Sequence, residues 1–181
     1  MYEDSDIWMD AKIAQACKDG YVKLAFGLKL RTPLLKKSVL GNRYTSNEAK
    51  AEARTVGNAV GGQSYGLLNN RAANEFMQIV WNSPYRYRIM PVALIHDAIY
   101  LIIEDNLEVL EFANKHLTKC MEWQELDEIW HDEVKLGGDL DLFYPTWAHG
   151  ITLGRTDSKL DIIKKVDNAM HEYYEKLKKE A

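Results

Sequence analysis

Cysteine, proline and long apolar runs are all scarce in this 181-residue sequence. It holds two cysteines and four prolines, and it lacks a run of about 20 apolar residues, the length that a membrane-spanning helix requires. The first residues, MYEDSDIW, are acidic and lack the apolar core of a secretory signal. The lone pair Cys17 and Cys120 has no metal-ligand spacing and suits a reducing compartment better than a disulfide framework. We therefore expect a cytoplasmic protein without membrane contact.

The charge is unevenly distributed along an otherwise ordinary globular composition. The sequence is 46% hydrophobic and 28% charged, and its length suits a single domain with a sizeable core. The net charge of -4 combines +8 over residues 20–90 with -9 over residues 91–181 and -3 over residues 1–19. Such a division is typical of a protein with one surface for a polyanion and another for cations. The alternative is a surface on which these charges simply mix.

The first part of the chain predicts a helix, a hairpin and a long second helix. Residues 3–18 follow a helical pattern that ends at a glycine, and GYVKLAFGLKLRTP alternates like a hairpin with strands at 21–25 and 28–32. After a basic loop, a helix is predicted from Ser46 to about Val80. Each glycine inside it costs about 1 kcal/mol against alanine, so we expect a kink or break there. These glycines are Gly57, Gly61, Gly62 and Gly66.

The second part predicts strands interleaved with helices. The β-branched and aromatic residues of 92–103 favour two short strands that meet at 96–98 over one buried helix. A helix follows at 107–121, then a strand over EIWHDEVKLGG at 128–138, then a charged helix at 158–179. This order predicts an α+β fold with an antiparallel sheet and packed helices.

An ionisable pair, His96-Asp97, interrupts the apolar stretch VALIHDAIYLII. A buried carboxylate is costly unless it is paired, hydrogen-bonded or bound to a metal. The pair could be a satisfied core pair, or the metal pair of a helical His-Asp phosphohydrolase, which ALIHDAIY resembles. That family draws a further histidine from upstream, and none of the five histidines here precedes His96. A third interpretation is a nucleotidyl transfer site, where carboxylates hold two divalent ions, and the tip of a rigid hairpin suits such a ligand.

Several motifs, taken in order, resemble the family A DNA polymerases, and the bacteriophage members most closely. VALIHDAIYLII resembles the His-Asp-Glu hairpin, and GYVKLAFGLKLRTPLL resembles the Gly-Tyr-Val hairpin with its Gly-Arg-Arg turn. EARTVGNAVGGQSYGLLNNRA resembles the helix that carries Arg, Asn and Gln toward the primer–template minor groove. DEVKLGGDLDLFYPTWAH resembles the last palm strand and the Trp-containing tail. The resemblance covers about residues 1–150 and implies a palm-type antiparallel sheet.

The resemblance implies roles for five residues. Asp97 matches the metal-ligand aspartate, and His96 matches the histidine beside the primer terminus. Arg54 and Asn58 match the residues that face DNA, and they lie four apart on one helix face. Gln63 matches the family glutamine but lies five residues after Asn58, where the family usually has four. Minor-groove acceptors are common to all base pairs, so such contacts test shape without reading sequence.

The sequence also departs from the family. The third hairpin residue is Ala98 where the family has Glu, and a literal His-Asp-Glu triplet at 131–133 lacks an apolar partner strand after it. We therefore assign the site to Asp97. The second metal aspartate and the fingers helix that holds the triphosphate are missing. The aspartates before Asp97 follow no apolar strand: Asp4, Asp6, Asp10 and Asp19.

The sequence thus predicts the C-terminal part of a polymerase module at 1–155 and a helical extension at 156–181. The implied cofactor is Mg2+ in a two-metal site completed by a carboxylate from elsewhere. The implied partners are primer–template DNA, a deoxynucleoside triphosphate and a complementary N-terminal polymerase part. If a phage encodes the chain, its location is the host cytoplasm, and the isolated chain is expected to be inactive. The alternative class is a non-catalytic DNA-binding or assembly subunit.

Overall fold

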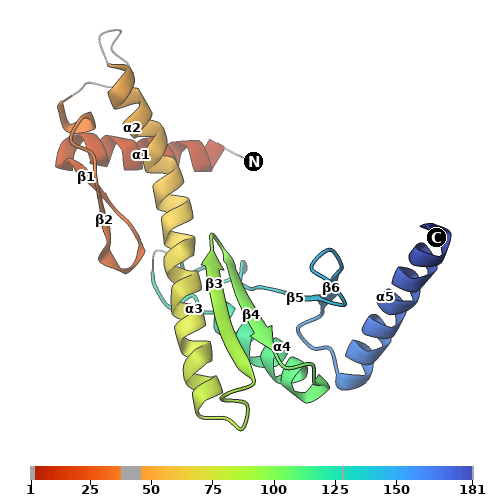
Figure 1. Cartoon of the computed structure of the whole chain (residues 1–181). Coiled ribbons are helices and arrows are strands. Elements are labelled where there is room, and N and C mark those ends of the chain that lie inside the picture. The colour runs from red at the N-terminus through yellow and green to blue at the C-terminus, as the bar shows by residue number, and fades with distance from the viewer. Residues whose placement is uncertain (1–2, 38–45, 128, 181) are drawn as a thin grey trace. The chain divides into compact units, whose positions relative to one another are not determined.

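The structure, a computed structural model, describes residues 3–37, 46–127 and 129–180. The chain divides into two compact units, Met1–Leu68 and Asn69–Ala181. Helices and strands both contribute, and the described strands form three two-stranded antiparallel sheets (Figure 1). The predicted α+β class is therefore confirmed, with small hairpins in place of one larger sheet among the described residues.

The first unit begins with the predicted helix and hairpin. Helix α1 (Glu3–Asp19) ends at Gly20, whose φ of +78° is open to glycine but strained for other residues. Strands β1 (Tyr21–Lys23) and β2 (Lys29–Arg31) pair antiparallel, and a short 3-10 turn, η1 (Ala25–Gly27), joins them. The hairpin is confirmed, with strands shorter than the alternation predicted.

The segment after the hairpin is tied to helix α2 (Asn47–Asn58) by a carboxylate. Glu52 Oε2 accepts hydrogen bonds from the backbone N–H groups of Leu34 and Leu35, at 2.9 and 2.7 Å. Leu35 is fully buried with Val56 of α2 in the core of this unit. The helix was predicted to begin at Ser46, and this residue caps α2, since its hydroxyl accepts a hydrogen bond from the Ala49 N–H. Much of the predicted basic loop, at 38–45, lies outside the described residues.

The glycine-rich part of the long helix forms a π-helical turn. Helix α2 is followed directly by the π-helical segment η3 (Ala59–Gln63) and by helix α3 (Ser64–Trp81). The expected irregularity is therefore a local change of winding, and helical structure continues through it. Gly57 has a separate role, because a Cβ at this position would lie 3.1 Å from the sulfur of Met9 on α1.

The second unit contains the hairpin that was expected around the His-Asp pair. Strand β3 (Ile89–Ile95) pairs antiparallel with β4 (Ala98–Ile103), from Ile89 opposite Ile103 to Ile95 opposite Ala98. The register shifts at Val92, between Pro91 and Ala93. Because proline lacks an N–H, a bulge beside it is a common way to keep it inside a hairpin.

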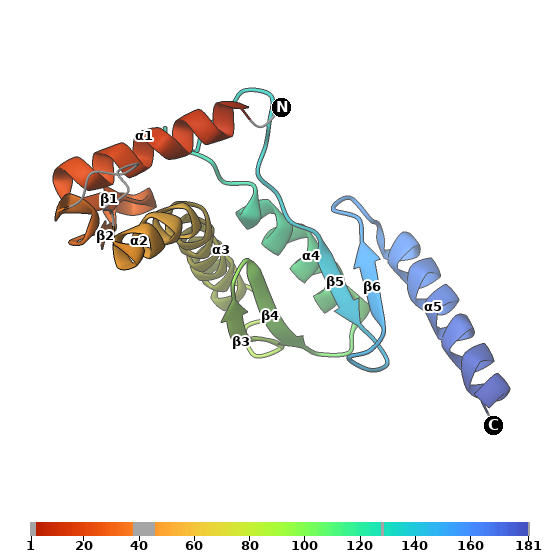
Figure 2. The same cartoon turned by 90° about the horizontal axis from the view of Figure 1, so that it is seen from above.

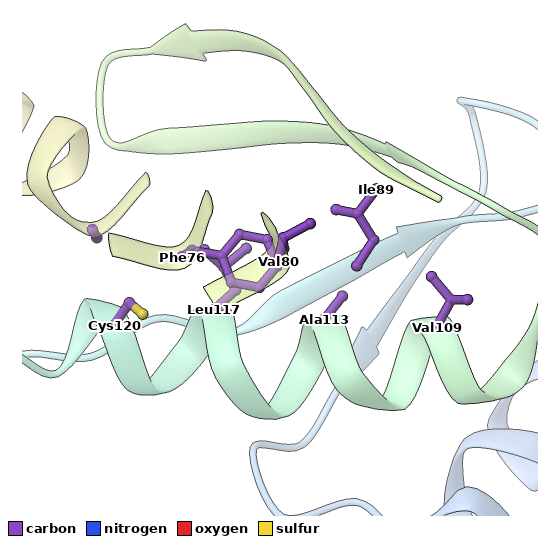
Figure 3. Close-up of a cluster of buried hydrophobic side chains, with 8 residues drawn as sticks. Phe76, Val80, Ile89, Val109, Ala113, Leu117 and Cys120 are labelled. Carbon is purple, nitrogen blue, oxygen red and sulfur yellow. The ribbon is translucent and has the colours of Figure 1, made fainter. Parts of the chain in front are cut away.

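Helices α3 and α4 (Leu107–Met121) pack on one face of this hairpin. Figure 3 shows their apolar side chains directed toward one another and toward Ile89 of β3. Helix α4 has the predicted bounds, and the Asn106 side chain caps it by accepting from the N–H groups of Glu108 and Val109. The buried members of this cluster are Ala72, Phe76, Val80, Ile89, Val109, Ala113, Leu117 and Cys120.

The strand predicted over EIWHDEVKLGG is wrong. Residues 129–138 form no strand, and the next strands are β5 (Leu140–Phe143) and β6 (Gly150–Leu153), which pair with each other. A strand needs a partner for its backbone groups, and the charged residues at 131–133 leave little apolar surface to bury. The next segment with alternating apolar residues, which begins at Leu140, forms strand β5 because it pairs with β6.

The last helix, α5 (Lys159–Glu180), agrees with the predicted 158–179. It packs through Ile162, Val166 and Ala169 on a small core with Leu110 of α4 and Leu153 of β6. Figure 2 shows α5 beside β6 within the second unit. Among the described residues, none of the helices has the length and apolar character to cross a membrane.

Candidate functional site

His96 and Asp97 form the tip of the β3–β4 hairpin. Both side chains are exposed, while Ile99 and Leu101 on β4 pack against the core of the unit. His96 has a φ of 54°, in the left-handed region that costs a residue with a Cβ about 1–2 kcal/mol. Such a conformation persists only where the surroundings hold it, and it is enriched at functional sites. The sequence therefore places Asp97 on a rigid base and directs it to solvent.

Asn69, on α3, supports this tip from beneath. Its side chain is 2% exposed, and its Nδ2 donates to the carbonyl oxygen of Ala98 at 3.2 Å and to that of His96 at 3.5 Å. The two carbonyls bracket Asp97 in the chain, so one amide group fixes the backbone on both sides of the candidate carboxylate. Sequence reasoning missed Asn69, although it shares a helix face with Ala73, Phe76 and Val80.

The other end of the hairpin is closed by an ion pair. Arg88 precedes β3 and Glu104 follows β4, and the Arg88 Nη2 lies 2.6 Å from a carboxylate oxygen of Glu104. The backbone N–H of Glu104 also donates to the Arg88 carbonyl at 2.9 Å. Hydrogen bonding from Arg88 lowers the pKa of Glu104, so the pair stays ionised well below neutral pH. The hairpin is therefore held at both its base and its tip.

One face of the hairpin is apolar but exposed. Met90, Val92 and Ile102 are each more than half exposed, and Tyr100 lies against the ring of Trp147 at 5.6 Å. Met90 and Ile102 are directly opposite each other, which places them on the same face of the sheet. The apolar residues that flank the His-Asp pair therefore pack against the core on the face toward α3 and α4, and the other face stays exposed.

The three residues expected to face DNA all belong to the first unit. Arg54, Asn58 and Gln63 are exposed, and Arg54 and Asn58 lie four apart on α2. Gln63 is the last residue of the π-helical turn. A π-helix forms hydrogen bonds between residues five apart, so it accommodates one more residue per turn than an α-helix. The turn therefore returns Gln63 toward the helix face of Asn58 despite the five-residue spacing.

The literal His-Asp-Glu triplet lies in an irregular, exposed segment. The Nδ1 of His131 accepts from the backbone N–H groups of Glu133 and Val134, at 3.1 and 2.9 Å. These bonds make a local turn, and no strand precedes or follows within residues 129–138. The triplet therefore lacks the hairpin setting that the Asp97 carboxylate has.

Comparison with known proteins leaves the family open. Neither the models of protein families, nor the curated proteins, nor the solved structures gave a match to this chain. The function is therefore argued from the residues and the geometry.

Two chemical interpretations of the pair can be weighed on that basis. The phosphohydrolase interpretation needs His96 and Asp97 on a helix, and the structure has a strand, a turn and a strand there. The core-pair interpretation needs burial, and both side chains are exposed. In the part of the chain that the structure describes, His, Cys, Asp and Glu side chains form no cluster of three or more suited to a metal ion.

Proposed function

We propose that this chain is the C-terminal palm segment of a phage-like family A DNA polymerase. Residues 1–155 supply the His96-Asp97 hairpin and the DNA-facing helix for template-directed nucleotidyl transfer, and residues 156–181 are an extension. The observation that carries the proposal is the exposed Asp97 carboxylate at the tip of a hairpin whose other face is packed. Rigid presentation of a carboxylate is what a two-metal site requires.

Asp97 is the residue of this chain that would hold Mg2+. A hard oxygen ligand suits that ion, and a complementary N-terminal part would supply the second carboxylate and the triphosphate contacts. When bound, two such ions activate the primer 3′-hydroxyl and neutralise the departing pyrophosphate. The exposed apolar face with Met90 and Ile102 supports a partner, since a large exposed patch is typical of an interaction surface. His96 would lie beside the primer terminus.

Complementation tests the catalytic part of this proposal. The purified chain alone should incorporate no nucleotide, and adding a family A polymerase fragment with fingers and the other aspartate should restore Mg2+-dependent primer extension. Asp97→Ala should abolish extension without lowering stability, because the side chain is exposed. Asp132→Ala is the matched control from the irregular triplet and should leave extension unchanged. Robust incorporation by the chain alone, or loss of extension with Asp132→Ala, would refute this assignment.

DNA binding is proposed for the basic 20–90 block through Arg54, Asn58 and Gln63. The contact is largely electrostatic and to minor-groove acceptors, so affinity should fall steeply with salt and show little sequence preference. In the reconstituted complex, Arg54→Ala should weaken primer–template binding and flatten its salt dependence. Lys179→Ala, in the acidic half, is the control and should do neither. Equal behaviour of the two variants would contradict the DNA-facing role.

The same experiments distinguish the proposed polymerase segment from a non-catalytic DNA-binding or assembly subunit. A DNA-binding or assembly subunit would retain salt-dependent binding through Arg54. It would remain inactive with every complementary fragment, and Asp97→Ala would then change nothing that can be measured. Restored extension that depends on Asp97 is the result that distinguishes the enzyme from such a subunit.

A further inference from the structure

Helix α5 carries two apolar stripes, and the core of the unit uses one. The inner stripe is Ile162, Val166, Ala169 and Tyr173. Ile162 is fully buried, Val166 and Ala169 pack on the same small core, and the Tyr173 ring contacts that of His149 at 4.6 Å. These spacings of four, three and four residues follow one face of an α-helix. The inner stripe therefore accounts for how α5 is attached to the second unit.

The outer stripe lies on a neighbouring face and is exposed except at Met170, which is half-buried. Its members alternate by three and four residues, which is the heptad pattern of a helix that packs on another helix. They are Leu160, Ile163, Asp167, Met170, Tyr174 and Leu177. The exposed fractions of Leu160, Ile163, Tyr174 and Leu177 are 58, 40, 53 and 44%. The stripe runs for about 26 Å at 1.5 Å per residue, and Figures 1 and 2 show the C-terminal half of α5 directed away from the rest of its unit.

Basic side chains border the outer stripe on its solvent side. Lys164, His171 and Lys178 recur every seven residues at the position next to the stripe, where coiled coils place the charges that select a partner. Lys164 and His171 form no ion pair among the described residues, and Lys178 contacts Glu175 at 2.8 Å in an exposed pair of small energy. Among the acidic residues of the helix, Glu175 lies beside Lys178 on this flank, and Asp167 lies within the stripe itself.

Charge excludes a second copy of this helix as the occupant. In a parallel pair, identical positions face each other, so Asp167 would oppose its own copy in the apolar seam. In an antiparallel pair that matches Leu160 with Leu177 and Ile163 with Tyr174, Lys164 lies level with Tyr173 of the copy and nearest to its His171. The parallel pair sets like charges together, which destabilises a helix pair, and the antiparallel pair places basic side chains beside basic side chains. A lipid surface is disfavoured by Asp167, because a carboxylate in the middle of the apolar face opposes insertion.

We propose that the outer stripe of α5 docks an amphipathic helix of another protein, with acidic residues flanking its apolar seam. The acids would meet Lys164, His171 and Lys178, and a cationic or amide side chain would face Asp167. Apolar anchors at heptad spacing supply the contact area, and the flanking charges select the partner and its orientation. This inference does not depend on the polymerase proposal, because residues 156–181 lie outside the resemblance.

A designed peptide tests the inference with the full chain. The probe is a 21-residue helix of three heptads with Leu in the seam, one central Lys to face Asp167, and Glu at all flanking positions. The Glu residues keep it from pairing with itself. The control peptide exchanges the charges, with Lys flanking and a central Glu. By titration calorimetry, the acidic-flanked peptide should bind at least tenfold more tightly than the control peptide.

Variants of the chain then locate the contact. Ile163→Asp and Tyr174→Asp should each weaken binding of the acidic-flanked peptide at least tenfold, with helicity by circular dichroism unchanged since both side chains are exposed. The double change Lys164→Glu with Lys178→Glu should reverse the preference between the two peptides. Lys179→Glu reverses one charge on the opposite face of α5 and should have no effect.

Three results would contradict the proposed docking of an acidic-flanked helix on the outer stripe. Failure of the acidic-flanked peptide to bind, or binding that the stripe variants leave intact, removes the docking surface. Concentration-dependent dimerisation of the chain in sedimentation, abolished by Ile163→Asp, would identify a second copy as the occupant. Binding to phosphatidylserine-containing vesicles through Tyr174, with neither peptide bound, would identify a membrane surface.

Discussion

The role of Asn69 under the hairpin tip gives a stability prediction that needs no assumption about function. Asn69→Ala removes an amide that donates to the carbonyls of Ala98 and His96 at 3.2 and 3.5 Å. A hydrogen bond contributes about 0.5–1.5 kcal/mol net, and stranding a buried partner costs about 1–3 kcal/mol. The 3.5 Å bond to the His96 carbonyl is long for a hydrogen bond and therefore weak. That carbonyl also lies at an exposed turn, so its loss should cost less than the loss of the bond to Ala98. We therefore expect a loss of about 1–3 kcal/mol in the free energy of unfolding.

The neighbouring residue supplies a matched control. Asn70 is exposed on the same helix, so Asn70→Ala should change the free energy of unfolding by less than about 0.5 kcal/mol. Urea denaturation of both variants measures the difference, and hydrogen exchange should show faster exchange at the tip in Asn69→Ala alone. Equal stability of the two variants would refute the role of Asn69.

An isosteric change sharpens the test. Asn69→Asp keeps the size of the side chain but replaces the N–H donor with a carboxyl that faces carbonyl oxygens. Burial and those oxygens raise the pKa of this carboxyl in the folded state above its unfolded value. Its protonated form can still donate one hydrogen bond. Relative to the parent, the Asn69→Asp variant should therefore lose least stability at low pH and lose more as the pH rises through the folded-state pKa. A difference from the parent that is independent of pH would contradict this account.

Three further predictions concern the tip, the last helix and the thiols. His96→Gly should raise the free energy of unfolding by about 0.5–1 kcal/mol in urea, because glycine accepts the φ of 54°. Hydrogen bonding from Lys165, then from a backbone N–H, lowers the pKa of Asp157, so Asp157→Asn should lower stability at pH 7 but match the parent once the pH falls well below about 3.9. Burial raises the pKa of Cys120 to about 11, so iodoacetamide near neutral pH should alkylate half-buried Cys17 first.

Each of these has a control and a contrary result. Asp97→Gly, at a position without the left-handed φ, should not stabilise, and equal gains at both positions would contradict the strain at His96. Asp105→Asn changes an exposed carboxylate that makes no side-chain hydrogen bond in the described part of the chain, so at pH 7 it should lower stability less than Asp157→Asn does. Alkylation of Cys120 as fast as Cys17 in the native protein would show that the second unit opens readily.

Elements with their own local signals were predictable from the sequence. Helix α4 has the predicted bounds because a capping Asn106 precedes a clear helical spacing of apolar residues. The β3–β4 hairpin was predicted because β-branched residues flank a polar turn. Both depend on residues close in sequence, which is the information that a single sequence holds.

Features that depend on distant partners were not predictable. The sequence of 128–138 has the alternating pattern of a strand. A strand also needs a second strand to pair with it, and the strand that lies nearby in sequence, β6, pairs with β5. Whether hairpins join into one sheet is likewise decided by pairing between distant segments. Asn69 was missed because asparagine in a helix is usually exposed, and its burial follows from the turn above it.

The π-helical turn shows how local backbone geometry can reconcile an apparent mismatch in the sequence. In a regular α-helix, five residues turn by about 500°, which would leave Gln63 about 140° away from Asn58 around the axis. Residues Ala59–Gln63 form one wider turn, and a Cβ placed at Gly61 or Gly62 would meet no other group within 4 Å. The π-helical turn accommodates the extra residue at the flexible glycine pair. Helices α2 and α3 on either side therefore keep their own buried faces. The five-residue spacing is therefore compatible with a shared face for Arg54, Asn58 and Gln63, which the α-helical spacing rule alone would have denied.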